Sequence, residues 1–76
     1  MTLDRVKKGQ WVKIMSISDS LTRLQAIRFG IGEETVVACS EIIPGGPIII
    51  NRCRQQVALG RKLAGKINVV LEEKSL

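Results

Sequence analysis

The sequence predicts a small, mainly β fold in which five short strands close into a barrel and one short helix follows the first strand. Three observations lead to this prediction. The chain has 76 residues, enough for one small domain. Its apolar residues fall in short runs rich in valine and isoleucine, bounded by glycine, proline and serine. Five short strands are too few for a sandwich, whereas a barrel leaves no strand edge exposed.

The first strand and the helix are expected in the N-terminal part of the chain. Residues 3–10 read as a lead-in that ends in a turn, and the run QWVKIMSI at 10–17 predicts the first strand because β-branched residues dominate it. A serine or aspartate within 18–20 can accept a hydrogen bond from a first-turn amide, which predicts a helix over 21–29. Apolar residues of this helix stand at Leu21, Leu24 and Ile27.

The end of the helix has its own signature. Gly30 follows the helical run and can take the left-handed conformation of a C-terminal cap, after which Ile31 can fold back on the last turn. Arg28 in that turn suits the negative end of the helix dipole. The sequence therefore predicts that the helix stops at Phe29.

The remaining elements are short. Further strands are expected over 33–43, 48–53, 57–59 and 66–71, with a compact turn at 44–47, a second turn at 54–56, a single helical turn at 60–65 and a solvated tail at 72–76. No repeat, low-complexity segment or linker divides the chain, so residues 1–76 are expected to form a single domain.

Length and charge limit the functional classes. No apolar run approaches the roughly 20 residues that cross a bilayer, and the N-terminus lacks the apolar region of a signal peptide, so a cytoplasmic protein is expected. The net charge of +5 favours an acidic partner, which could be nucleic acid, an anionic membrane face or an acidic protein surface.

The sequence does not predict an enzyme. It has no histidine, and it contains neither GxxxxGK[ST] nor GxGxxG. Its seven acidic residues fall at termini, caps and turns rather than as a paired carboxylate site. We therefore expect no catalytic residue and no cofactor.

The two cysteines bear on metal binding. If the turn at 44–47 closes a regular hairpin in which Ile43 faces Ile48, Cys39 faces Arg52, and Cys39 and Cys53 then point to opposite faces of the sheet. A one-residue bulge would instead bring the two thiols opposite each other. We expect two reduced, buried thiols and no metal site, because a zinc or iron site needs three or four ligands.

The order and spacing of these features resemble the family of ferrous iron transport protein A (FeoA). The features that carry the resemblance are QAIRFGI at 25–31, PGGPIII at 44–50, VALGRKLA at 57–64 and INV at 67–69, with Leu3 and the KGQ turn at 8–10 before them. The chain departs from the family pattern at 25–26, where many members have an arginine–leucine pair, and at 31–34, where many have a proline–glycine pair.

The resemblance implies an SH3-like β-barrel with a helical insertion after the first strand. It also implies a cytosolic protein without enzymatic activity that binds and modulates the cytosolic domain of an FeoB-type ferrous iron transporter, reaching the inner membrane surface through that partner. The same fold occurs as a C-terminal domain of iron-dependent repressors. The resemblance does not imply an oligomeric state.

Three groups of residues are candidates for partner binding. They are the helix end, the glycine–proline turn and a basic set: Leu24, Arg28, Phe29 and Ile31; Pro44, Gly45, Gly46 and Pro47; and Arg52, Arg54, Arg61 and Lys62. At the helix end, Phe29 and Ile31 either clasp the helix onto the barrel or form an exposed apolar knob. The basic set is either a docking patch for an acidic partner or a solvated face.

Two alternative functions belong to other classes. The first is a transition-metal-binding or metal-sensing SH3-like domain. The second is a small barrel that binds nucleic acid, which the sequence disfavours because Trp11 and Phe29 are its only aromatic residues and stacking platforms need more. We therefore expect no nucleic-acid partner.

Overall fold

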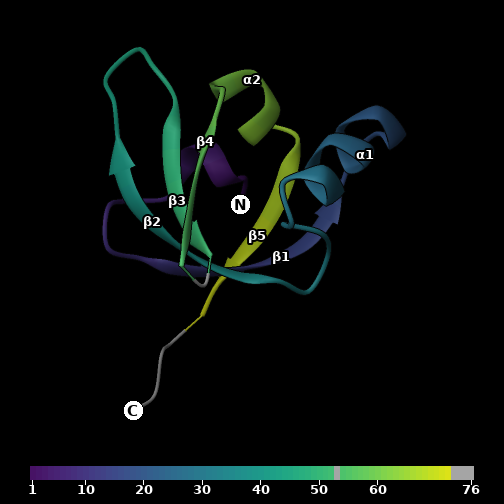
Figure 1. The fold of residues 1–76 in the computed structure, drawn as a ribbon, viewed down its shortest axis with the longest axis horizontal. Coiled ribbons are helices and arrows are strands. Elements are labelled where there is room, and N and C mark those ends of the chain that lie inside the picture. The colour runs from purple at the N-terminus through teal and green to yellow at the C-terminus, as the bar shows by residue number, and fades with distance from the viewer. Residues whose placement is uncertain (53, 73–76) are drawn as a thin grey trace.

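The computed structural model describes residues 1–52 and 54–72 and contains one five-stranded antiparallel sheet. The elements, in chain order, are η1 (Leu3–Arg5), β1 (Trp11–Ile17), α1 (Ser20–Arg28), β2 (Val36–Ile42), β3 (Ile48–Arg52), β4 (Gln55–Leu59), α2 (Arg61–Ala64) and β5 (Ile67–Leu71). This order confirms the predicted class, a mainly β fold with a helix inserted after the first strand. Figure 1 shows that α1, α2 and the β2–β3 loop gather at the same end of the curled sheet.

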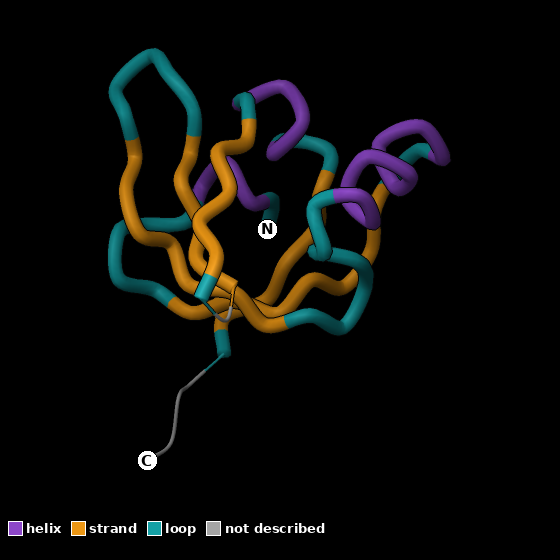
Figure 2. The backbone as a smooth tube through the Cα atoms, in the orientation of Figure 1, coloured by secondary structure: helices purple, strands orange, loops and turns teal. Residues whose placement is uncertain are grey.

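The sheet has the strand order β4-β3-β2-β1-β5, so its two end strands are not paired with each other in the described part of the chain. The N-terminal residues cover the outer edge of β5. Met1 donates from its amino group to the carbonyl of Val69 at 3.2 Å, and the amide of Val69 donates to the carbonyl of Met1 at 2.7 Å. The barrel is therefore open between β4 and β5, and one of its edges is capped by the chain's own N-terminus (Figure 2).

The core lies inside the curl of the sheet. Alternate residues of the strands point inward, as the period of a β-strand requires, except where the register shifts in β1 and β2 make Ile17 and Ile42 the next inward residues. Apart from Thr22, the buried residues are all apolar: Leu3, Val6, Val12, Ile14, Ile17, Ala26, Ile31, Val37, Cys39, Ile48, Ile50, Leu59, Ala64, Ile67 and Val69. These side chains come from all five strands and from both helices, so the helices are fixed to the same core as the sheet.

Both predicted caps of α1 are present. Asp19 is the N-cap, and its carboxylate accepts hydrogen bonds from the amide and the hydroxyl of Thr22. At the other end, Gly30 has φ +75° and donates to the carbonyl of Ile27, while Ile31 donates to that of Ala26. This pair of bonds is the Schellman pattern, and it places Ile31 back over the helix in the core.

Several predicted boundaries were wrong. The second strand was expected from residue 33 but begins at Val36, because Glu34 takes φ +70° and Thr35 bonds back to Gly32, so this stretch turns instead of extending. The turn expected at 54–56 is shorter. Gln55 already pairs with Arg52, and β4 therefore begins two residues earlier than predicted.

The predicted register of the β2–β3 hairpin was also wrong. Ile48 pairs with Ile42 instead of Ile43, and Cys39 pairs with Ile50 instead of Arg52. The cause lies in two irregularities. Ile43 stays in the loop, where its amide donates to the carbonyl of Pro47, and the register shifts between Cys39 and Glu41, which leaves an extra residue on β2. The predicted relation between Cys39 and Cys53 falls outside the described residues.

Candidate functional site

The predicted helix-end residues divide between the core and the surface. Ile31 is fully buried and clasps the helix onto the barrel, whereas Phe29 is 42% exposed. Leu24 and Arg28 lie on the side of α1 that faces away from the barrel. Ile31 therefore fits the interpretation as a clasp between the helix and the barrel, and Phe29 fits the interpretation as an exposed apolar knob.

The outer face of α1 is apolar. Thr22 and Ala26, four residues apart, form the buried face of the helix, and the opposite side presents Leu21, Leu24 and Ile27, exposed to 67%, 63% and 60%. A surface helix normally turns its large aliphatic side chains toward the core. We call Leu21, Leu24, Ile27 and Arg28 the outer face of α1.

The glycine–proline loop is a tight turn held from outside by α2. Pro44 and Gly45 occupy its two central positions, Gly45 has φ +70°, and the amide of Gly46 donates to the carbonyl of Ile43 at 2.8 Å, as in a type II turn. The same carbonyl accepts a bond from the guanidinium of Arg61 at 3.2 Å. The structure thus joins one residue of the basic set to the predicted loop.

The rest of the basic set does not gather in one patch. Arg52 is half-buried beneath the end of α1, where its Nη1 lies 3.3 Å from the position that a Cβ on Gly30 would occupy. Arg54 precedes β4, whereas Arg61 and Lys62 follow it, so the five-residue strand separates them. Of the four predicted basic residues, only Arg61 and Lys62 share an element.

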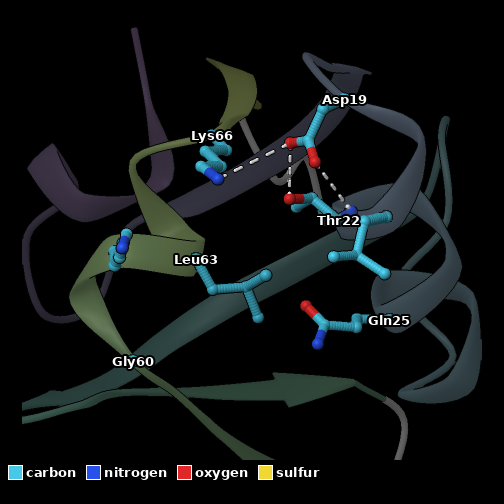
Figure 3. A pocket seen from close by; sticks show the side chains of 8 residues that line it. Asp19, Thr22, Gln25, Gly60, Leu63 and Lys66 are labelled. Atoms are coloured by element: carbon cyan, nitrogen blue, oxygen red, sulfur yellow. Dashed lines mark hydrogen bonds and ion pairs between the residues drawn. The ribbon is translucent and has the colours of Figure 1, made fainter.

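A groove lies between α1 and α2 (Figure 3). Its volume is about 310 Å³, and it is lined by Asp19, Leu21, Thr22, Gln25, Gly60, Lys62, Leu63 and Lys66. Figure 3 shows Leu63 and Gln25 pointing into the space between the two helices. Among the residues predicted from the sequence, Lys62 alone lines this groove. The exposed position of Leu21 was not foreseen, because the sequence does not show which face of a short helix will be packed.

Asp19 closes one end of the groove. One carboxylate oxygen accepts from the hydroxyl of Thr22 at 2.6 Å and lies 3.9 Å from the Nζ of Lys66, and the other accepts from the amide of Thr22 at 3.3 Å. The bond from the Thr22 hydroxyl is the main reason why the pKa of Asp19 is lowered, with smaller contributions from the Thr22 amide and the Lys66 charge. Ser18 also bonds to the Lys66 carbonyl through its amide and its hydroxyl, which fixes this end.

Few side chains of the described residues are placed to act as metal ligands. Within residues 1–52 and 54–72, no three Cys, Asp or Glu side chains lie together as a ligand set. Cys39 is a free, buried thiol, and burial raises its pKa. Across the same described ranges, no helix is both long and apolar enough to span a membrane.

Comparison with known proteins identifies a matching family and several solved structures with the same fold. A family model described as FeoA domain matches residues 1–71. A crystal structure of an iron uptake regulatory protein (FeoA) is 25% identical, with a TM-score of 0.88 over 95% of this chain and 97% of that one. An FeoA-like protein from Clostridium acetobutylicum is 23% identical, with a TM-score of 0.85 over 100% of this chain and 91% of that one.

The same fold occurs inside a larger protein. The metal-dependent transcriptional regulator MtsR is 14% identical, with a TM-score of 0.81 over 95% of this chain and 34% of that one. No curated protein matches the chain. Since the family match extends over residues 1–71 and the FeoA structures share the whole barrel, the chain belongs to the FeoA domain family.

Proposed function

We propose that this chain is a cytosolic accessory protein of bacterial ferrous iron uptake that binds the cytosolic part of an FeoB-type membrane transporter and modulates it. Membership of the FeoA domain family supports the role in iron uptake. The similar FeoA structure of an iron uptake regulatory protein supports the same assignment. A binding role also suits a chain in which the sequence offers no catalytic histidine.

The observation that carries the binding part of the proposal is the outer face of α1. Three large aliphatic side chains on a nine-residue helix are each at least 60% exposed, although the small Thr22 and Ala26 are buried on its other side. Contiguous exposed apolar side chains of this kind mark interaction sites on soluble proteins. Full burial of one leucine or isoleucine contributes about 1.5–3 kcal/mol, so this face could supply much of the affinity for a partner.

The test is an NMR titration of the isotope-labelled chain with the cytosolic domain of the ferrous iron transporter of the same organism. We expect shifts at Leu24, Ile27 and Phe29. Leu24→Glu should weaken binding by about tenfold or more, because it places a charge where an apolar contact forms. Since Leu24 is 63% exposed, this variant should retain the thermal stability of the wild type to within about 0.5 kcal/mol.

A matched control is Leu71→Glu. Leu71 is 58% exposed, but it lies at the end of β5 that is remote from α1 in Figure 1. This variant introduces the same charge and should bind as the wild type does. Equal binding by all three proteins would refute the outer face of α1 as the binding surface. Saturable shifts at Cys39 or Glu34 on adding Fe²⁺ alone, with none on adding the transporter domain, would refute the proposed function.

A further inference from the structure

The groove between α1 and α2 combines two apolar walls with a basic rim. Leu21 is 67% exposed on one wall, and Leu63, half-buried against the core, forms the other. The volume of the groove, about 310 Å³, is at the lower end of the range for ligand sites, so the groove suits one or two side chains better than a whole cofactor. The shape therefore favours a site for a bulky apolar side chain.

The charge of the groove is positive. Lys62 and Lys66 both line it, and Asp19 is the only acidic residue among the lining residues. The carboxylate of Asp19 is already engaged by the amide and hydroxyl of Thr22 and by Lys66. An incoming cation would find no unengaged carboxylate among these lining residues, whereas an incoming carboxylate would face the ammonium group of Lys62.

From this combination we infer that the groove binds a protein segment in which a bulky apolar side chain is flanked by aspartate or glutamate. The inference rests on the function proposed above and assigns the segment to the same transporter domain. The apolar side chain packs between Leu21 and Leu63, and the neighbouring carboxylates pair with Lys62 and with the exposed side of Lys66. Leu21 belongs to both the groove and the outer face of α1, so one partner helix or loop can cover both surfaces.

Gly60 offers a way to fill the groove without straining the fold. Its backbone has φ −62° and ψ 151°, which any residue adopts, and a Cβ built there meets no atom within 4 Å. As the N-cap of α2, Gly60 accepts a hydrogen bond from the amide of Ala64 through its backbone carbonyl, which a substitution keeps. Gly60→Leu should therefore fold normally and place an aliphatic side chain beside the groove, while Gly60→Ala changes the same position with little added volume.

The experiment uses capped, overlapping peptides that tile the cytosolic part of the ferrous iron transporter of the same organism, together with the intact cytosolic domain. We expect the NMR signals of Leu21, Gln25 and Leu63 to shift only with peptides that carry a bulky apolar residue beside acidic residues. Gly60→Leu should weaken both the peptide and the intact domain about tenfold or more, and Gly60→Ala should leave both unchanged.

Charge reversal tests the rim separately. Lys62→Glu should weaken binding about three- to tenfold, because it replaces an attraction at an exposed pair with a repulsion. Lys7→Glu is the matched control, since Lys7 is exposed, lies outside the lining set and carries the same change of charge. Lys66 is not reversed, because a glutamate there would face Asp19.

The outcomes separate the two proposals. Domain binding that is lost in Leu24→Glu but unchanged in both Gly60→Leu and Lys62→Glu would overturn the groove inference and leave the proposed function standing. Peptides that bind equally well after their acidic residues are replaced by glutamine and asparagine would also overturn it. No binding of the intact domain by the wild type would overturn both.

Discussion

The guanidinium of Arg61 donates a hydrogen bond to the carbonyl oxygen of Ile43 at 3.2 Å, and this bond ties α2 to the loop between β2 and β3. The same carbonyl closes the turn by accepting from Gly46 at 2.8 Å. The bond therefore joins the loop to α2 across the whole of β3 and β4, which separate them in the sequence. The guanidinium of Arg61 is therefore part of the surface that the loop presents around Ile43.

Arg61→Ala should loosen the loop without unfolding the protein. The bond is exposed, so we expect the free energy of unfolding to fall by less than about 1 kcal/mol. The amides of Gly45 and Gly46 should exchange with solvent faster, because the loop loses its outside anchor. Hydrogen exchange by NMR measures this effect. Lys62→Ala removes a charge from the same helix but no bond to the loop, and similar exchange rates in both variants would contradict the prediction.

A side chain at Gly30 should destabilise the fold. Gly30 has φ +75°, which costs other residues about 1–2 kcal/mol, and a Cβ there would lie 3.3 Å from Nη1 of Arg52. Gly30→Ala should therefore lower the free energy of unfolding by about 1–2 kcal/mol in chemical denaturation. Gly60→Ala is the control, because its φ of −62° suits alanine and the space around it is open. A Gly30→Ala variant as stable as Gly60→Ala would show that the Schellman cap does not require glycine.

Asp19 should make the stability of the protein depend on acidity. Its pKa is lowered in the folded state, mainly by the hydroxyl of Thr22, so its contribution is complete above its ordinary value of about 3.8 and is lost as the pH falls through the lower, folded value. Asp19→Asn keeps a capping side chain but cannot titrate. The stability difference between wild type and this variant should therefore be constant at neutral pH and change only below about pH 4. A difference that changes between pH 6 and 8 would point to another group.

The parts of the fold that could be predicted depend on local interactions. The N-cap at Asp19 and the glycine cap at Gly30 each involve residues within five positions of each other, so the printed sequence contains everything they need. The hairpin register could not be predicted, because it depends on Ile43 staying in the loop and on a bulge between Cys39 and Glu41, and no local pattern announces either. A bulge of one residue shifts every cross-strand pair beyond it.

The candidate surface, which consists of the outer face of α1 and the groove, could be predicted only in part, because part of it depends on contacts between residues far apart in the sequence. The sequence identified Leu24, Phe29 and Lys62, whose residue types suggest contact with a partner. It did not identify the groove, because Leu21 and Leu63 are 42 positions apart and come together only in the folded chain. Ile31 was a candidate for the same surface, but the Schellman cap directs it into the core.

Cys39 should be inert in the folded protein. It is only 2% exposed, and burial raises the pKa of its thiol, so both access and thiolate formation are hindered. In a Cys53→Ser background, a thiol reagent should modify Cys39 far more slowly at pH 8 in native buffer than in denaturant. Modification should occur only when the core opens. A variant that destabilises the core, such as Ile50→Val beside Cys39, should therefore speed the modification. Modification in native buffer as fast as in denaturant would mean that the cysteine is accessible and that β2 is not packed as described.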